Sequence, residues 1–271
     1  MRYAALYAAF RAARHGILAA GIVAFAATFA PTLAAAEPTD ITVRVLGKDS
    51  KFVGSSMGGA RVIVRDAGTG EILAQGVTEG STGDTKRIMG PQADARAIRS
   101  SEGAAKFVAT IDIDEPRLVE VEAYGPLAQP QAAHRVTATQ WVVPGRHISG
   151  GDGWVLELPG YVVDVLAPPA HVKLPPDTAS VELRASVALM CGCPITPGGL
   201  WDADTLEVKA LVKHNGEPLP PVDLAFAGET SQFKGALPVS GAGLYDVTVY
   251  AHNARNGNTG LDRTTFIVPD K

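Results

Sequence analysis

Hydrophobic and polar residues alternate along short segments of this chain, with turn residues between the segments. In residues 40–46, for example, Ile41, Val43 and Val45 share one face. A period of two predicts strands that bury one face and expose the other. The same period recurs over 60–65, 107–113 and 119–123, and 71–76 follows a Gly-rich turn as the hairpin partner of 60–65.

The second half of the chain repeats this behaviour. Apolar residues share one face over 180–190, and Asn215-Gly216 is a strong signal for a two-residue hairpin. Over 243–251 the inward positions are Tyr245, Val247, Val249 and Ala251. The pattern predicts an all-β protein made of two tandem β-sandwich domains.

The expected domain limits follow from composition. The first sandwich is predicted over 37–166, and the Pro-rich stretch 167–172 is predicted as a stiff linker. The second sandwich is predicted over 173–271.

The first sandwich resembles the carboxypeptidase-regulatory-like (transthyretin-like) family over residues 40–126. The resemblance rests on Gly59-Ala60-Arg61-Val62-Ile63-Val64, Thr69-Gly70-Glu71, Gly76-Val77-Thr78, Ala105-Lys106-Phe107 and Val119-Glu120-Val121-Glu122-Ala123-Tyr124-Gly125. It implies a scaffold or adhesion module. The chain departs from the family over 82–103, where a short turn is replaced by a long loop with several basic residues; we expect a mobile or partner-contacting loop, with a plain surface insertion as the alternative.

The second sandwich resembles the immunoglobulin-like domains of bacteria. Gly243-Leu244-Tyr245-Asp246-Val247-Thr248-Val249-Tyr250-Ala251, followed by a last strand, is similar to their final hairpin. The resemblance implies that Tyr245 supplies a tyrosine-corner hydrogen bond.

Residues 1–36 have the order of a secretory signal peptide. Three arginines and no acid accompany an apolar run over 17–29, and Ala34-Ala35-Ala36 precedes Glu37. We expect cleavage after Ala36; the alternative is an uncleaved anchor, for which the run is shorter than the roughly 20 residues required. The leader is of bacterial type, which predicts a periplasmic or secreted protein.

The charge composition limits the classes of partner that we expect. Loss of the leader takes the formal net charge from −4 to −7, because the leader holds three arginines and no acid. Such a chain has no basic patch, so nucleic acid is not an expected partner. No membrane span is expected after signal cleavage. Another periplasmic or surface protein is the expected partner.

Both cysteines lie in Met190-Cys191-Gly192-Cys193, at the end of a predicted strand. Strand parity turns Cys191 and Cys193 inward and Met190 outward. In an oxidising compartment three interpretations stay open: a disulfide, a soft-metal site, or thiols that are structural or pair with another protein. For the metal site, two thiolates and a thioether favour Cu(I). His214 and His252 are the histidines that could complete the ligands Met190, Cys191 and Cys193, and they would widen the choice to zinc or Cu(II).

The sequence contains no motif that would indicate an enzyme. No nucleophile elbow, phosphate-binding loop or metalloprotease motif is present, so we predict no catalytic residues. A thiol-redox enzyme that uses the two cysteines is a distant alternative. We expect Trp201, like Trp141 and Trp154, to pack on the end of a sandwich rather than to stack on a sugar.

The sequence therefore predicts an exported, non-enzymatic binding or interaction protein with a candidate copper or redox site at Met190-Cys191-Gly192-Cys193. The alternative is an adhesion, surface or accessory scaffold module of a larger complex, in which the cysteines are structural.

Overall fold

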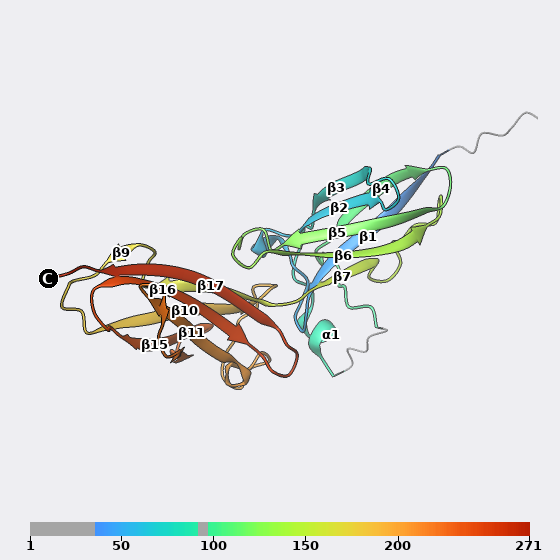
Figure 1. Cartoon of the computed structure of the whole chain (residues 1–271). Coiled ribbons are helices and arrows are strands. Elements are labelled where there is room, and N and C mark those ends of the chain that lie inside the picture. Colours follow the sequence, from blue (N-terminus) through green and yellow to red (C-terminus); the bar gives the residue numbers. More distant parts are fainter. Residues whose placement is uncertain (1–35, 92–96) are drawn as a thin grey trace, which may run out of the picture. The chain divides into compact units, whose positions relative to one another are not determined.

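The computed structural model describes residues 36–91 and 97–271 (Figure 1). The predicted signal peptide falls almost wholly outside the described residues. Residues 35–271 form one compact unit. Its regular structure is nearly all strand, arranged in four sheets, which confirms the predicted all-β class and the pair of sandwiches.

The first sandwich packs a three-stranded sheet, in the order β4-β1-β7, against a four-stranded sheet, in the order β3-β2-β5-β6. β1 pairs with β4 in antiparallel and with β7 in parallel orientation. The strands are β1 (Glu37–Gly47), β2 (Arg61–Asp66), β3 (Ile72–Val77), β4 (Phe107–Ile113), β5 (Arg117–Gly125), β6 (His134–Val142) and β7 (Trp154–Leu158). A 3-10 helix, η1 (Ser55–Met57), precedes β2.

The alternation predicted for these strands decides which side chains fill the first core. Val62 and Val64 of β2 and Val119 and Val121 of β5 are fully buried. Each sheet turns one face to this core, so the pattern reads apolar inward and polar outward, except over residues 41–47 of β1, where both faces are buried. The remaining core includes Ile41, Val43, Val45, Ala109, Ile111, Ile113, Ala123, Trp154, Leu156 and Leu158.

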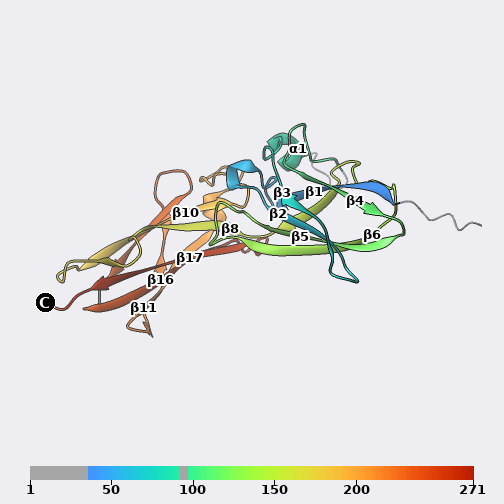
Figure 2. The same cartoon turned by 90° about the horizontal axis from the view of Figure 1, so that it is seen from above.

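The long excursion over 82–103 packs, where it is described, against the outer face of β1. It contains the helix α1 (Thr85–Met89), which Figure 2 shows on the far side of β1 from β5 and β6. Ile88 of α1 is buried against Phe52 and neighbours. Beneath the excursion, buried Arg44 donates from Nη1 to Ala104 O (2.7 Å), which satisfies part of a charged group that lies out of water. The expected loop is thus a packed cover in its described part.

The second sandwich packs a four-stranded sheet, in the order β14-β15-β10-β8, against a sheet in the order β12-β11-β16-β17-β9, with β13 also paired to β11. Its long strands are β8 (Tyr161–Ala167), β10 (Ser180–Leu189), β11 (Glu207–His214), β15 (Gln232–Pro238), β16 (Gly243–His252) and β17 (Thr259–Val268). Its two-residue strands are β9 (Val172–Lys173), β12 (Glu217–Pro218), β13 (Val222–Asp223) and β14 (Ala225–Phe226). Asn215-Gly216 forms the predicted hairpin turn, both residues having positive φ.

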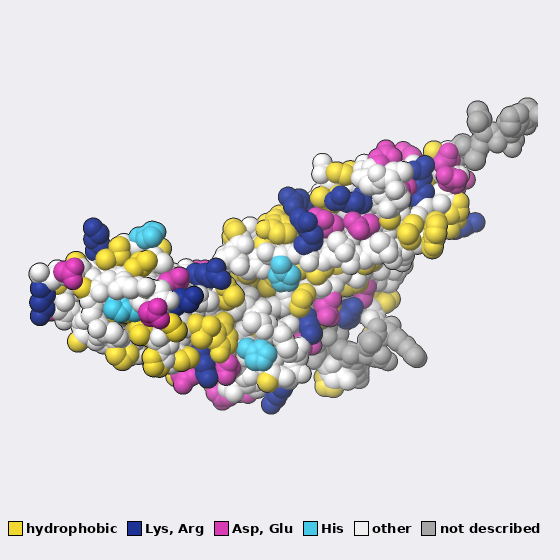
Figure 3. Space-filling model, in the orientation of Figure 1, with side chains coloured by type: hydrophobic (Ala, Val, Ile, Leu, Met, Phe, Trp, Pro, Cys, Tyr) yellow, Lys and Arg dark blue, Asp and Glu magenta, His cyan; other side chains and the backbone are white. Residues whose placement is uncertain are grey.

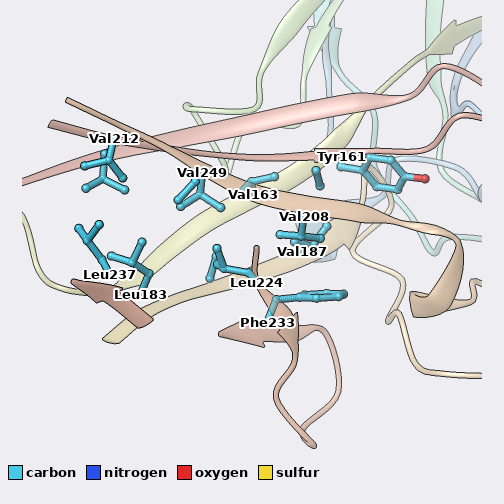
Figure 4. Packing of buried hydrophobic residues seen from close by; sticks show 14 of the residues in the cluster. Tyr161, Val163, Leu183, Val187, Val208, Val212, Leu224, Phe233, Leu237 and Val249 are labelled. Carbon is cyan, nitrogen blue, oxygen red and sulfur yellow. The ribbon is translucent and has the colours of Figure 1, made fainter. Parts of the chain in front are cut away.

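The second core is a layer of aliphatic residues, with the rings of Tyr161 and Phe233 on the same side of it in Figure 4. Tyr245 carries the predicted tyrosine corner: its hydroxyl donates to Gly241 O (2.9 Å) and accepts from Ser240 N (2.9 Å). Its ring stacks on Phe266 at 4.6 Å between centroids. This corner is the feature by which the second sandwich is immunoglobulin-like.

One strand lies on the other side of the predicted domain boundary. The predicted limits place β8 in the first sandwich, whereas the structure pairs β8 with β10 of the second, from Arg184↔Ala167 to Leu189↔Tyr161 with one register shift after Arg184. The connection between the sandwiches is therefore Pro159-Gly160, ahead of β8, and the Pro-rich stretch 167–172 lies within the second sandwich. Turn residues occur at both places in the sequence, and only the sheet pairing distinguishes them.

Candidate functional site at the junction

The Met190-Cys191-Gly192-Cys193 stretch forms a tight turn directly after β10. Gly192 N donates to Leu189 O (2.7 Å), and Leu189 N donates to Cys193 O (3.2 Å). Gly192 adopts φ +75°, a left-handed conformation that glycine enters without a Cβ clash. The turn brings the two cysteine Cα atoms to 5.4 Å, and their sulfurs form a disulfide. Of the three interpretations of the cysteines, the structure has the disulfide.

The side chains of this turn point into two different cores. Cys191 and Cys193 lie in the second core, as strand parity predicts. Met190 points away from that core, also as predicted, but it is not exposed: 1% of its surface is accessible, because it lies in the core of the first sandwich. An outward position on one sandwich is thus an inward position on the other.

The five residues predicted to hold a metal are not brought together. His214 stacks on Tyr245 at 4.4 Å, and the Nδ1 atom of His252 lies 3.1 Å from Thr259 Oγ1. In the β11–β16 register, His214 faces Tyr245 and His252 faces Glu207, at opposite ends of the pair. Seven strand positions correspond to about 23 Å, too far for one ion. Within the described ranges, no group of three or more His, Cys, Asp or Glu residues could hold a metal ion.

Four hydrogen bonds join the turn after β1 to loops of the second sandwich. Trp201 Nε1 donates to Asp49 O (2.8 Å), and Asn256 Nδ2 donates to Asp49 Oδ2 (2.6 Å). Lys48 Nζ donates to Asn256 O (2.7 Å), while Asn258 Nδ2 donates to Lys48 O (3.2 Å). The two sandwiches therefore share a polar interface around the buried Met190.

A groove of about 340 Å³ opens beside this interface. Its floor is apolar, and its rim carries amide, carboxylate and guanidinium groups. The residues that line it are Asp49, Met89, Tyr161, Leu189, Ile195, Leu200, Trp201, Asp202, Thr205, Leu206, Asn253, Arg255 and Asn256. Both sandwiches and the segment after the disulfide contribute to it.

The charges of the groove are fixed by hydrogen bonds. The backbone amides of Asp204 and Gly198 hold the pKa of Asp202 below its ordinary value against the effect of burial, and Arg255 lowers it further. Burial raises the pKa of Tyr161, although the nearby amides of Asn253 and Asn256 act to lower it. At neutral pH the groove thus holds the neutral phenol of Tyr161 and the ionised carboxylate of Asp202.

The wider surface does not carry a field of one sign. Over β2 and β5, basic and acidic side chains lie next to one another (Figure 3). Arg65 Nε lies 3.5 Å from Glu120 Oε1, and Arg135 Nε lies 3.3 Å from Glu122 Oε1. Charges paired in this way do not favour a polyanion. Within the described residues, no helix has both the length and the apolar character that a membrane crossing requires.

The three tryptophans differ in their surroundings. Trp154 is buried in the first core, opposite Val43 in the middle of β1, with 8% of its surface exposed. Trp201 packs on the second core while its indole reaches Asp49, as the sequence predicts. For Trp141 the prediction is wrong: 67% of its surface is exposed. It lies on the outer face of β6 opposite Leu118, where no second layer covers it in the described part of the chain.

Comparison with known proteins leaves the family open. Neither a scan against models of protein families nor a search of curated proteins found a match. Among solved structures, the fibronectin(III)-like modules of Clostridium thermocellum CbhA align over 86% of this chain and 87% of theirs, with 11% identity and a TM-score of 0.29. The titin domains z1z2 align over 88% and 98%, with 10% identity and a TM-score of 0.26.

Two further matches are partial. An engineered protein aligns with 46% of this chain at 19% identity and a TM-score of 0.28, and a Cellulomonas fimi endo-beta-1,4-mannanase with 43% at 20% identity and a TM-score of 0.25. The chain spans 24% and 20% of their lengths. At these TM-scores the function has to be argued from the site itself.

Several groove residues escape sequence reasoning. Asp49, Asn253, Arg255 and Asn256 lie in turns whose sequences signal only a change of direction. Trp201 is among the groove residues that the sequence singles out. What makes the others part of a site is that two turns, about 200 residues apart in sequence, face each other across the junction.

Proposed function

We propose that this protein is an exported, non-enzymatic interaction protein that binds a segment of another periplasmic or surface protein in the groove at the junction. The observation that carries the proposal is the groove itself, with an apolar floor and a polar rim drawn from both sandwiches. Its volume is at the lower end of the roughly 300–1,000 Å³ typical of ligand sites, which suits one or two side chains of a partner.

Exposed apolar surface supports a protein as the partner. Leu200 is 56% exposed on the rim of the groove, next to the ring of Trp201. An exposed leucine beside a fixed aromatic ring is an arrangement typical of protein contacts, where a few apolar anchors provide most of the binding free energy. Arg255 and Asp202 on the same rim would then orient the partner.

The buried disulfide agrees with a scaffold role for the cysteines. Cys191 and Cys193 contribute their side chains to the second core, as structural residues do. The resemblance of the first sandwich to carboxypeptidase-regulatory-like modules, which remains a prediction, agrees with an adhesion or accessory role in a larger complex. Export through a signal peptide is likewise part of the proposal.

Copper is not part of this proposal. In the oxidised protein both cysteine sulfurs are used in the S–S bond, and thiolates are the ligands that copper would require here. The copper hypothesis applies only to a reduced form, and a measurement given below tests it.

Site-specific photo-crosslinking in cells tests the groove. A photoreactive amino acid at Leu200 should give a discrete adduct with one partner, whereas the same residue at Leu211, an exposed leucine of β11 outside the groove, should not. The substitution Leu200→Asp should lower binding of the captured partner at least about tenfold, because it places a charge at an apolar anchor. Leu211→Asp is the matched control.

Two results would contradict the proposal. One is an equal adduct from both positions, which would mean collision rather than binding. The other is a partner whose affinity is unchanged by Leu200→Asp.

A further inference from the structure

The disulfide turn contacts both sandwiches at once. Cys191 and Cys193 lie in the second core, while Met190 lies in the first. Gly192 packs against the first sandwich so closely that a Cβ built on it would lie 2.6 Å from Met57 Sδ. The turn is therefore held between the two sandwiches, and its successive residues face the first and the second sandwich in alternation.

The segment that follows attaches a second time to the first sandwich. Trp201 Nε1 donates to the backbone oxygen of Asp49, and Leu189 and Ile195, on either side of the disulfide, line the groove. Hence the geometry of the turn decides how residues 189–201 meet the first sandwich. The other junction contacts, such as Lys48 to the Asn256 carbonyl, are hydrogen bonds with exposed or half-buried partners, which water can replace at small cost.

The disulfide constrains this turn more than it constrains the fold. Loop-closure entropy grows with the number of residues enclosed, and this ring encloses Gly192 alone. Without the S–S bond, two backbone hydrogen bonds between Leu189, Gly192 and Cys193 would hold the turn. The sheets on both sides are held by their own ladders and cores. Loss of the bond should therefore loosen the junction and leave the two sandwiches folded.

We propose that the Cys191–Cys193 disulfide is a redox-sensitive clamp that holds the two sandwiches in one orientation. A dithiol reductant supplies the two electrons. One of its thiolates attacks a cysteine sulfur, breaks the S–S bond and forms a mixed disulfide with that cysteine. The second thiol of the reductant then attacks the reductant's own sulfur in the mixed disulfide and releases the cysteine. Cys191 and Cys193 end as thiols with one proton each, and the reductant ends as a disulfide.

Burial of the two sulfur atoms slows their reduction but does not prevent it. The two cysteines are 2% and 5% exposed, so a reductant reaches sulfur only after local opening of the turn. Gly192 is exposed and is the part of the turn that solvent meets first. Once reduced, the turn keeps its backbone hydrogen bonds but loses its covalent restraint, so it holds Met190 and Gly192 less firmly against the first sandwich, and the sandwiches can move about Pro159-Gly160.

Two fluorophores placed through non-canonical amino acids at the exposed residues Thr137 and Lys234 report the orientation without added cysteines. The distance distribution between them should be narrow in the oxidised protein and broader after dithiothreitol. The Cys191→Ser/Cys193→Ser variant should be broad without reductant. Amide exchange of Gly192 should rise at least about threefold, while that of Val247 in the core should stay unchanged.

Met190→Ala in the oxidised protein is the matched control, since it removes the same contact without touching the disulfide and should broaden the distribution too. The proposal is wrong if the distance distribution between the fluorophores is the same before and after a reduction that is verified by mass. It is also wrong if the disulfide resists excess dithiothreitol for as long as the protein stays folded. Should the serine variant fail to fold, the reduced natural protein still decides. The proposal does not rest on partner binding, which this experiment does not involve.

Discussion

At the scale of single residues, buried polar atoms show how closely the second sandwich is specified. The hydroxyl of Tyr245 makes three backbone hydrogen bonds, one donated to Gly241 O and two accepted from the amides of Ser240 and Gly241. Its ring lies between His214 and Phe266, stacked on both. The apolar ring fills the core while the hydroxyl satisfies a turn that would otherwise leave amides unpaired.

Tyr245→Phe should therefore lower the free energy of unfolding by about 1–3 kcal/mol, because two amides lose their acceptor while the ring stays in place. Tyr250→Phe is the matched control: it removes the same atom from the same strand, but from an outward position bonded to Glu207 (2.6 Å). That change should cost about 0.5 kcal/mol or less. Denaturant titration of both variants measures the difference, and equal losses would contradict the role assigned to the corner.

The residue at which the two cores meet is Met190, which is 1% exposed. A flexible thioether fits an irregular space between two sandwiches better than a branched side chain would. Gly47 and Gly160 make that space, since a Cβ on Gly47 would lie 3.2 Å from Met190 Cβ, and one on Gly160 would lie 3.9 Å from its Sδ.

At the scale of elements, the excursion over 82–103 is held by a small number of polar anchors. Asp152, in the turn before β7, accepts from the amides of Arg99 (3.0 Å) and Ser100 (2.7 Å). Asp84 caps α1 by accepting from Arg87 N (2.7 Å). Asp152 therefore fastens Arg99 and Ser100 to the turn before β7, while Ile88 fastens α1 to the cluster around Phe52.

The attachment should depend on pH in an acidic window. Burial acts to raise the pKa of Asp152, but the amides of Ser100 and Arg99 outweigh it, so that its pKa lies below the ordinary value of 3.8. Because the folded-state pKa is lowered, this contribution is complete above 3.8 and is lost as the pH falls through the folded-state pKa. Exchange protection of the Arg99 and Ser100 amides, corrected for intrinsic rates, should fall in that window.

Asp152→Asn keeps an acceptor oxygen and removes the charge, so this variant should show weaker protection without the acid-dependent loss. Asp112→Asn, an exposed carboxylate of β4, is the control and should behave like the natural protein. An acid-dependent loss that persists in Asp152→Asn would assign the titration to another group.

At the scale of the whole molecule, the state of the two cysteines separates the functional hypotheses. Intact protein from the periplasm should be about two daltons lighter than its reduced form and should resist alkylation until it is reduced. After equilibration with copper and gel filtration, the oxidised protein should carry no stoichiometric metal, because its sulfurs are bonded to each other. About one copper per chain that disappears in Cys191→Ser/Cys193→Ser would contradict this and restore the copper hypothesis.

Much of the fold follows from local pattern, and the candidate site does not. The faces of β2, β5, β10 and β16 follow from alternation, because an antiparallel strand with one wet face has to repeat every two residues. His214 and His252 show the opposite case. Both lie in the second sandwich, so the sequence suggests them as ligands of one metal site. The strand register, however, places them at opposite ends of the β11–β16 pair.

The sequence by itself determined the class, the strand faces, the hairpin at Asn215-Gly216 and the inward direction of both cysteines. These depend on period, turn chemistry and parity, which act over a few residues. Only the tertiary structure decided that β8 joins the second sandwich, that Met190 is buried, and that Asp49 meets Asn256. Those outcomes depend on which surfaces meet, and no local pattern records whether an outward side chain faces water or a second core.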